Sequence, residues 1–332
     1  MLRRFLVTLS PATLALVPAA RADGSGGSIS ASQGSPGAVS ADGTLRYVAL
    51  ADGRGRTMVE AIRTRDGSTM GFGSVAGSYG TPWVTGGKMG GLSPDGRTLV
   101  LAQATAYAGL RRVSRFLVYD SKRLWAPQER IPLRGDFAFD ALSPHGRTLF
   151  LIQHLSARNL SRYVVRAYDL RRSTLLPQRI ADRTQRGWVM SGYPVARATS
   201  AGGRWVYTLY QNPGGYPFVH ALDTVGRKAH CVGVPWRSKD QSGLWKLALS
   251  VGGGGKQLAL RWRSGRAYLA IDTQSFRISY PQSRADGRGS AWWPLLATAA
   301  GAVLLSAAGL LAARRRWRLP KRSPARTPAP IP

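Results

Sequence analysis

Five segments of the chain share one pattern of a polar turn followed by an apolar run. Each segment opens on Ser-x-x-Gly, and mostly apolar residues follow within a few positions. The motifs begin at Ser40, Ser93, Ser143, Ser200 and Ser250, so the serines lie 53, 50, 57 and 50 residues apart. The run TLVLAQ after the second motif is apolar at most positions, as in strands that are covered on both faces. The pattern predicts a turn and then a buried strand in every unit.

A second marker recurs in phase with the first. A β-rich run closes on aspartate in each unit, at Asp66, Asp120, Asp169, Asp223 and Asp272. Two phased markers indicate a repeat architecture. The turn chemistry agrees, because proline presets φ at the second position of a turn and glycine accepts a left-handed fourth position. We predict four strands per unit: an inner strand, the buried strand, the strand ending at Asp, and an outer strand such as 129–133 or 176–180.

Repeated four-stranded sheets with both faces covered are typical of β-propeller blades. The Ser-Pro-Asp-Gly turn at Ser93–Gly96, with its apolar run, resembles the WD40-like repeats of TolB-type propellers, and the resemblance covers residues 37–280. It implies an all-β propeller and no particular activity. The five regularly spaced units predict five blades of four antiparallel strands each. Units four and five depart from the motif, with Gly202 and Gly252 in place of Asp. The alternative is a six-bladed ring with a degenerate blade from the Gly-rich stretch 71–91.

The two ends of the chain carry targeting and anchoring patterns. Residues 1–22 combine a basic start, an apolar stretch and the small-x-small site Ala20–Ala22, as in a cleavable signal peptide. Residues 292–313 are 22 uncharged residues, which as a helix would span about 33 Å and match the hydrocarbon core of a bilayer. An arginine cluster follows directly, so the positive-inside rule predicts a single-pass membrane protein with its N-terminal part outside and its tail in the cytoplasm.

These patterns divide the chain into six parts. A flexible leader (23–36) follows the signal peptide, and the propeller ectodomain occupies 37–280. A linker (281–291) then leads to the transmembrane helix (292–313) and to a basic, Pro-rich cytoplasmic tail (314–332). Ile29 could add an edge strand to the last blade, which the sequence leaves open. We expect localisation at the cell membrane, with the propeller outside the cell.

The charge of the chain changes the expected partners. Lys and Arg number 47 against 16 Asp and Glu, which gives a formal net charge of +31. Without the signal peptide and tail, 37 basic and 16 acidic residues remain, a charge of +21 on the ectodomain. Such a charge attracts polyanions within a Debye length of about 8–10 Å. Lipid head groups and anionic wall polymers are the polyanions outside a bacterial membrane, and export excludes nucleic acid. The alternative is that this charge only reflects an Arg-rich composition and lies on solvated surface without a partner.

The candidate binding face lies where the long connections emerge. In propellers of this strand order, the loops between second and third strands and those between blades share one face. Here they place aromatics and amides beside arginines, which suits a glycan, a peptide or a phosphate-bearing ligand. The candidate residues are Gln103, Tyr107, Arg111, Gln153, His154, Trp188, Tyr193, Gln211, Tyr216 and Trp236. The same aromatics could instead fill the central channel and the gaps between blades.

Motifs for catalysis or metal binding are scarce. The chain has no GxSxG, its two glutamates (Glu60 and Glu129) lie in predicted strands, and its four histidines show no metal spacing. Cys231, the only cysteine, fits a small buried strand residue better than a nucleophile or a ligand. We therefore expect no cofactor and a non-enzymatic binding or scaffolding module for a wall polymer, a glycan or a membrane-protein partner. The alternative is an envelope hydrolase or lyase with carboxylates in the propeller funnel.

Overall fold

The computed structural model describes residues 31–85, 88–104, 110–159, 161–184 and 190–281 of the chain. All but the last of these residues belong to one compact unit that ends at Tyr280. The predicted signal peptide, transmembrane helix and tail lie outside the described residues. Among the residues that are described, no helix is long and apolar enough to cross a membrane.

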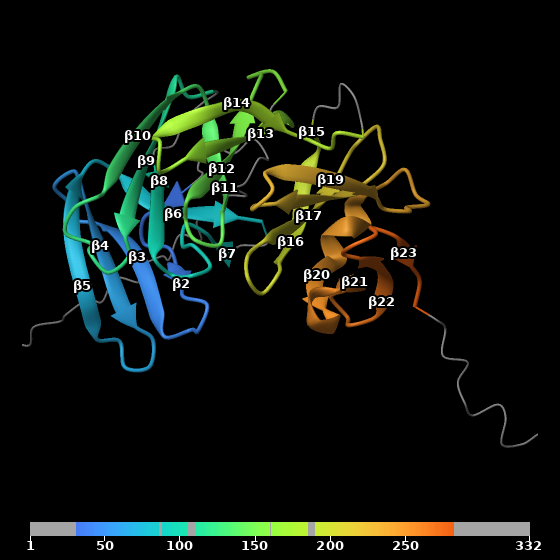
Figure 1. Cartoon of the computed structure of the whole chain (residues 1–332), viewed down its shortest axis with the longest axis horizontal. Helices are drawn as coiled ribbons and strands as arrows, with labels where there is room; N and C mark the ends of the chain where they lie inside the picture. Colours follow the sequence, from blue (N-terminus) through green and yellow to red (C-terminus); the bar gives the residue numbers. More distant parts are fainter. Residues whose placement is uncertain (1–30, 86–87, 105–109, 160, 185–189, 282–332) are drawn as a thin grey trace, which may run out of the picture. The chain divides into compact units, whose positions relative to one another are not determined.

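Five antiparallel sheets follow one another along the chain, and the main strands of each run in sequence order (Figure 1). The first contains β2 (Ala38–Val39), β3 (Leu45–Ala51), β4 (Arg56–Arg63) and β5 (Thr69–Ala76). The second contains β6 (Tyr79–Val84), β8 (Thr98–Gln103), β9 (Val113–Asp120) and β10 (Glu129–Arg134). The third contains β11 (Phe137–Leu142), β12 (Thr148–His154), β13 (Arg162–Asp169) and β14 (Thr174–Ile180).

The last two sheets keep the same order. The fourth contains β16 (Tyr193–Thr199), β17 (Trp205–Gln211), β18 (Phe218–Asp223) and β19 (Lys228–Gly233). The fifth contains β20 (Leu247–Gly252), β21 (Gln257–Trp262), β22 (Ala267–Asp272) and β23 (Ile278–Ser279), with short 3₁₀ turns at Ser242–Lys246 and Gly253–Gly255. Short strands β1 (Ala31–Ser32) and β7 (Lys88–Met89) extend the second sheet, and β15 (Met190–Ser191) extends the third.

This strand order confirms the all-β class and the four-stranded repeat unit, and β10 and β14 confirm the predicted outer strands. Such meanders, stacked by their faces, are β-propeller blades. The Gly-rich stretch 71–91 enters β5 of the first sheet and β6 and β7 of the second. In the described residues it forms no blade of its own, so the alternative of a sixth blade from this stretch is wrong there.

The leader of the propeller is partly built into the second sheet. Ala31 and Ser32 pair with Pro82 and Thr81 of β6. The hydroxyl oxygens of Ser35 and Thr81 lie 2.5 Å apart in a buried hydrogen bond. Residues 31–36 of the predicted leader therefore belong to the propeller unit, whereas Ile29 and its proposed edge strand lie outside the described residues.

The Ser-x-x-Gly turn joins inner and buried strands as predicted in the first four units. Ser143 shows the chemistry: its carbonyl accepts the N–H of Gly146 at 2.9 Å, and its hydroxyl accepts the N–H of Thr148 at 3.0 Å. Gly146 has φ +62°, and a Cβ there would lie 2.1 Å from Thr98 Oγ1, so the turn requires glycine.

The fifth unit departs from the prediction. Ser250 lies within β20 and pairs with Ala259, and the turn starts only at Gly253 because Gly252 still pairs with Gln257. Three successive glycines, Gly253–Gly255, all have positive φ and can make a turn without help from a serine. The motif therefore marks the wrong turn position in this unit.

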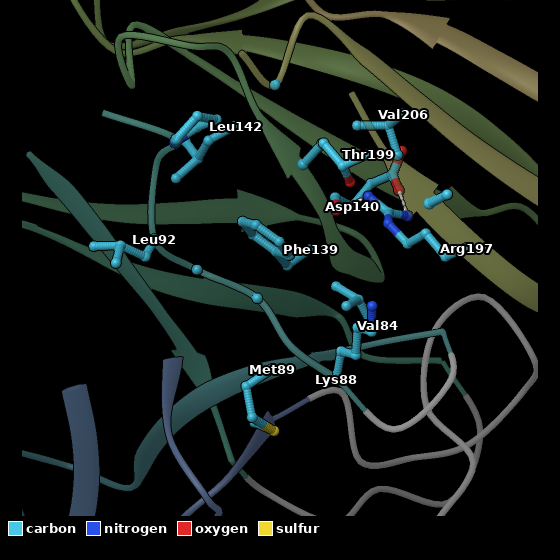
Figure 2. Close-up of a pocket in the computed structure, with 16 residues that line it drawn as sticks. Val84, Lys88, Met89, Leu92, Phe139, Asp140, Leu142, Arg197, Thr199 and Val206 are labelled. Carbon is cyan, nitrogen blue, oxygen red and sulfur yellow. Dashed lines mark hydrogen bonds and ion pairs between the residues drawn. The ribbon is translucent and has the colours of Figure 1, made fainter. Parts of the chain in front are cut away.

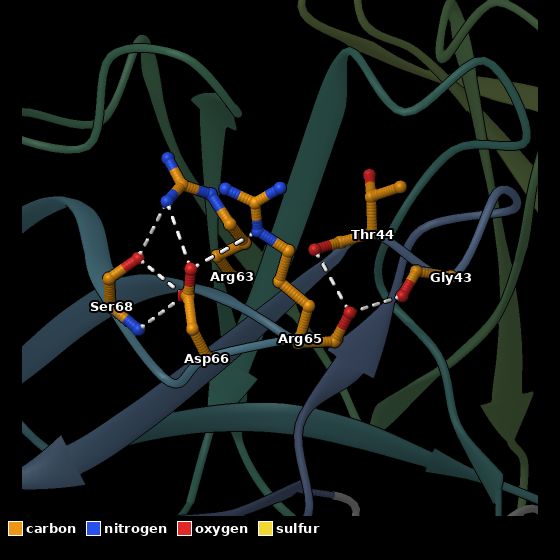
Figure 3. Close-up of polar contacts among 7 residues, drawn as sticks. Gly43, Thr44, Arg63, Arg65, Asp66 and Ser68 are labelled. Atoms are coloured by element: carbon orange, nitrogen blue, oxygen red, sulfur yellow. Dashed lines mark hydrogen bonds and ion pairs between the residues drawn. The ribbon is translucent and has the colours of Figure 1, made fainter.

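The aspartates that close the third strands hold the next turn. Asp169 Oδ1 accepts the N–H groups of Arg171 and Arg172, and Asp272 Oδ1 accepts those of Gln274 and Ser275. The first sheet differs from the prediction, because β4 ends at Arg63 and Asp66 lies three residues further on, in the turn itself. There Asp66 accepts from Ser68 and pairs with Arg63 and Arg65 (Figure 3). Hydrogen bonds from the Ser68 hydroxyl and N–H hold the pKa of the Asp66 carboxyl below its usual range. Their carboxylates are thus committed to turns.

The short turns share one end of each sheet. Thr64, beside Asp66, donates its hydroxyl to the carbonyl of Gly43 in the Ser-x-x-Gly turn at 2.6 Å (Figure 3). Thr224 does the same to Gly203 in the fourth sheet at 2.9 Å. The connections from the buried strand to the third strand, and those from one sheet to the next, leave from the opposite end, which we call the loop face.

Neighbouring sheets are joined by buried apolar clusters. Tyr47 and Ala61 of the first sheet pack with Leu99 and Leu117 of the second. Equivalent clusters join the second sheet to the third, the third to the fourth, and the fourth to the fifth. Each internal sheet is therefore covered on both faces, which explains why its buried strand is apolar at successive positions.

Candidate functional site

The structure describes eight of the ten predicted binding residues, and Tyr107 and Trp188 lie outside the described residues. All eight lie on or next to the loop face. Gln103, Gln153, His154 and Gln211 lie at the ends of buried strands, Tyr193 begins an inner strand, and Arg111, Tyr216 and Trp236 lie in connections. Their side chains nevertheless have different surroundings.

Tyr216 and Trp236 line one open groove on the loop face of the fourth sheet. Its volume is about 590 Å³, and its walls are 214–217, between β17 and β18, and 236–239 with Gln241, between β19 and β20. Tyr216 is 78% exposed. Arg237 and Lys239 add two cations to the same walls. We call this cavity the loop groove.

A buried glutamine fixes the two walls of the loop groove to each other. Gln241 Nε2 donates to the carbonyls of Asn212 and Gly215 at 3.0 and 2.8 Å, and its Oε1 accepts the N–H of Asn212 at 2.8 Å. All these bonds cross from one connection to the other. Because the Gln241 side chain holds the backbone of the β17–β18 connection, the groove is shaped before any ligand arrives.

The aromatic wall of the loop groove is held from behind. Trp236 Nε1 donates to the carbonyl of Asp240 at 2.9 Å, and the Trp236 ring lies 5.7 Å from Tyr268 and 6.2 Å from Trp262. The N–H and hydroxyl of Ser242 hold the pKa of the Asp240 carboxyl below its usual value. Asp240 is thus occupied with Ser242, and the groove presents aromatic and cationic groups, a combination that suits an anionic or sugar-bearing chain.

Arg111 and His154 meet through a carboxylate that the sequence reading did not pair with them. Arg111 Nε lies 2.6 Å from Asp136 Oδ1, and His154 Nδ1 lies 3.2 Å from Asp136 Oδ2. All three side chains are buried. Burial alone would raise the pKa of Asp136, but His154 and Arg111 outweigh it and lower the pKa. These two predicted binding residues therefore form a buried network beneath the loop face.

Two further predicted amides also have partners inside the protein. Gln153 Oε1 accepts from Arg166 at 2.8 Å, and Gln211 Oε1 accepts from the Trp245 indole at 2.9 Å. Of the described candidates, the structure gathers only Tyr216 and Trp236 around one open groove. Their partners Arg237, Lys239 and Gln241 were missed, although two basic residues beside Trp236 were visible in the sequence.

A second cavity, of about 320 Å³, lies along β11 and β16, the inner strands of the third and fourth sheets, and along the short strand β7 (Figure 2). We call it the inner cavity. Asp140 from β11 and Arg197 from β16 line it and form a salt bridge of 2.7 Å. Arg197 also donates to the carbonyl of Asp140 at 2.7 Å. Phe139 and Met89 give the cavity apolar walls. Among the residues described for this cavity, Asp140 is the one carboxylate, and its charge is compensated by Arg197.

Among the described residues, no histidine or cysteine lines the loop groove or the inner cavity. Cys231 is buried in β19, its Sγ lies 3.5 Å from His220 Nδ1, and burial raises the pKa of its thiol. Burial lowers the pKa of His220 to about 4. Within the described ranges, no group of three or more His, Cys, Asp or Glu side chains could hold a metal ion.

No protein-family model and no curated protein matches the chain. Solved structures give remote likenesses. A putative TolB from Agrobacterium tumefaciens is 13% identical, with 73% of this chain and 78% of that chain covered and a TM-score of 0.39. TolB from Acinetobacter baumannii is also 13% identical (74% and 55% covered, TM-score 0.38). Dipeptidyl peptidase 4 from Porphyromonas gingivalis is 13% identical (75% and 40% covered, TM-score 0.42).

The chain thus spans about half of the second of these proteins and less of the third. The likenesses include both TolB propellers and a peptidase, and such distant similarity selects no activity. The propeller fold of this chain rests on its own five sheets and on the clusters between them.

Proposed function

We propose that the protein is a membrane-anchored, extracytoplasmic β-propeller that binds an anionic cell-wall polymer through the loop groove. The observation that supports this most directly is the groove itself, where Tyr216 and Trp236 stand beside Arg237 and Lys239. Export by residues 1–22 and anchoring by 292–313 would hold it at the outer side of the cell membrane.

Charge favours a polyanion over a neutral glycan. The ectodomain carries 37 basic and 16 acidic residues, so its field attracts polyanions from any side. The loop groove would then be the binding site for the polymer, because its aromatic rings can pack against sugar or alkyl parts of the polymer. A neutral glycan or a membrane-protein partner would use the same face without the strong salt dependence.

Binding is favoured over catalysis by the state of the carboxylate in the inner cavity. Glycoside hydrolysis needs two carboxylates about 5–10 Å apart around its substrate. In the described part of the inner cavity, Asp140 is the one carboxylate, and it is paired with Arg197. We therefore propose a binding module without its own reaction.

We further propose that the first and fifth sheets close a five-bladed ring by packing on each other. The free face of the first sheet carries large apolar side chains: Leu50, Met58 and Phe72 are exposed, Phe72 to 68%. Leu50 pairs with Met58, and Phe72 pairs with Glu60 two residues further along β4, so these side chains share one face. An apolar face of this kind needs a cover.

The free face of the fifth sheet has the complementary shape. Ala259 pairs with Ala270 on this face. At the equivalent position of the third and fourth sheets an alanine pairs with an aromatic residue, Ala167 with Phe150 and Ala221 with Tyr207. Two alanines leave room for a large side chain from the next blade, and Met58 and Phe72 supply such side chains.

The test of the binding proposal is co-sedimentation of the full chain, in nonionic detergent, with bacterial walls across a salt series. Walls stripped of their anionic polymers are the matched control. Retention that needs the polymer and falls steeply with salt supports the proposal. Equal retention on stripped walls points to a neutral glycan, and absence of retention at low salt contradicts a wall ligand altogether.

A further inference from the structure

A third cavity, of about 480 Å³, lies at the rim between the fourth and fifth sheets, away from the loop groove. Its walls come from the start of β17 (Arg204, Trp205), from β19 (Lys228–His230) and from the turn after β22 (273–276). Residues 182–184, beyond β14, form the fourth wall, where Asp182 makes a parallel bridge to Ala229. We call this cavity the rim pocket.

Cations dominate the walls of the rim pocket. Arg183, Arg204 and Lys228 line it, against one lining carboxylate, Asp182. Asp182 is buried and its oxygens are engaged: Oδ1 accepts the N–H and hydroxyl of Thr184, and Oδ2 accepts the N–H of Cys231 at 2.8 Å. Asp182 therefore orders the pocket wall. Arg204 also lies 3.4 Å from Oδ2 of the buried Asp223, so three cations stand against two carboxylates and the pocket keeps a net positive charge.

Asp182 also orients an imidazole of the pocket. His230 Nδ1 lies 3.2 Å from Asp182 Oδ2. Burial alone would raise the pKa of Asp182, but hydrogen bonds from Thr184 and Cys231 and the charge of His230 lower it, so the carboxylate stays ionised. This contact turns one ring nitrogen of His230 toward Asp182 and fixes the orientation of the imidazole plane.

Aromatic rings complete the rim pocket. The Phe276 ring lies 4.3 Å from His230, at an interplanar angle of 31°, and 5.7 Å from Trp205 edge to face. Phe276 has φ +57°, a region that bulky residues rarely adopt. The corresponding turn positions hold Ser173 and Arg227. The positive φ of Phe276 costs roughly 1 kcal/mol or more of backbone strain, and the fold accepts this cost where Phe276 forms part of the pocket wall.

We propose that the rim pocket binds a small organic anion, a phosphate or a carboxylate attached to a flat ring. Arg204 and Lys228 would take the anionic group, since guanidinium and ammonium groups are the natural partners of such oxygens. Trp205 and Phe276 would contact the ring. The proposal does not depend on wall binding, because it uses none of the loop-groove residues.

The test is calorimetric titration of the full chain, in nonionic detergent, with phenyl phosphate, benzoate and inorganic phosphate. We expect one of the two ring compounds to bind at least tenfold tighter than inorganic phosphate, and the tighter one identifies the anionic group. Equal affinity for all three, or no measurable binding of any at millimolar concentration, overturns the proposal.

Variants place the binding in the rim pocket. Arg204→Gln with Lys228→Gln should weaken the tighter ring compound at least tenfold, whereas Arg237→Gln with Lys239→Gln in the loop groove should leave its affinity unchanged. Phe276→Gly keeps the cations, fits the positive φ and should reduce the preference for the ring compound over inorganic phosphate. Unchanged affinity in both rim-pocket variants, with thermal unfolding midpoints like that of the unaltered protein, contradicts the assignment.

Discussion

Arg197 and Asp140 form a salt bridge of 2.7 Å that joins the inner strands of the third and fourth sheets, 57 residues apart in the chain. Both side chains are only 8% exposed. A second bond from Arg197 to the Asp140 carbonyl, also 2.7 Å, fixes the guanidinium to the backbone. The pair therefore ties two blades together at the inner cavity and at the same time neutralises its carboxylate.

Replacing one partner of this pair should destabilise the protein strongly. Arg197→Met leaves the Asp140 charge buried without its counterion, and we expect the free energy of unfolding to fall by about 3–5 kcal/mol. The double variant Arg197→Met with Asp140→Leu removes both charges and should be more stable than the single variant. Urea unfolding of the three proteins measures this. A double variant as unstable as the single one would contradict the ion-pair account.

Stability should also depend on pH through His220. Its pKa in the folded protein is lowered to about 4 from 6.5, so the unfolded chain binds more protons between these values. The free energy of unfolding should therefore fall as the pH drops from 6.5 toward 4, by roughly 3 kcal/mol over the window at about 1.4 kcal/mol per pKa unit. Above pH 6.5 the contribution is constant.

Urea unfolding at pH 7.5, 5.5 and 4.5 tests this dependence. His220→Gln has no imidazole and should show a flatter decline, whatever its absolute stability. The comparison variant is His145→Gln, because the His145 side chain is 74% exposed and its contact with Asp95, at 3.5 Å, lies at the surface. Its removal should change the slope far less than His220→Gln does. Parallel slopes for the unaltered protein and His220→Gln would rule out the buried histidine as the cause.

Two motif serines, Ser143 in a turn and Ser250 in a strand, allow a prediction with a matched control. Ser143→Ala removes an acceptor for the N–H groups of Arg147 and Thr148, bonds of 3.1 and 3.0 Å, and should cost about 1 kcal/mol. Ser250→Ala changes a residue inside β20 and should stay within about 0.5 kcal/mol of the unaltered protein. Thermal unfolding distinguishes the two. A larger loss for Ser250→Ala would contradict the shifted turn of the fifth unit.

The difference between these two serines shows how far the sequence predicts the fold. A phased turn and an apolar run define a blade because both are local, so strands such as β10 and β14 could be expected from sequence spacing. In the fifth unit the three glycines after Gly252 form the turn at a new place. A motif match cannot reveal this, since any of several glycines could adopt the left-handed conformation.

The candidate site was harder to predict, and the reason is pairing between distant residues. Arg111 and His154 are residue types that are common in binding faces, yet both side chains contact Asp136. Asp136 lies 25 residues beyond Arg111 and comes from a third segment of the chain. Tyr216 and Trp236 lie on the loop face, as expected, because strand order alone decides on which end of the sheet a connection lies. Which side chain is exposed and which is paired depends on tertiary contacts that no local pattern encodes.

The proposed closure of the ring would make the exposed face of the first sheet sensitive to charge. Leu50→Glu would place a carboxylate between the first and fifth sheets, and we expect a loss of about 1–3 kcal/mol in the free energy of unfolding. Val225→Glu is the matched control, because Val225 is 56% exposed in the turn after β18. Its effect should stay within about 0.5 kcal/mol.

Mass measurement decides between closure within one chain and contact between copies. A monomer of the unaltered protein in which Leu50→Glu is destabilising supports the closed ring. A dimer that Leu50→Glu dissociates would mean that the first sheet of one copy packs on the fifth sheet of another. Equal stability of Leu50→Glu and Val225→Glu as monomers would mean that nothing covers the face.

The loop groove makes the last prediction. Arg237→Gln with Lys239→Gln removes two of its cations, and retention on polymer-bearing walls should fall severalfold with a weaker dependence on salt, because fewer counterions are released. Trp236→Ala should lower retention with little change in salt dependence, since it removes contact area and no charge. Arg171→Gln with Arg172→Gln is the control, because both arginines are exposed in a short turn at the opposite end of the third sheet. If this control variant loses as much retention as the groove variant, the wall senses only the total charge of the propeller and the groove is not the seat of binding.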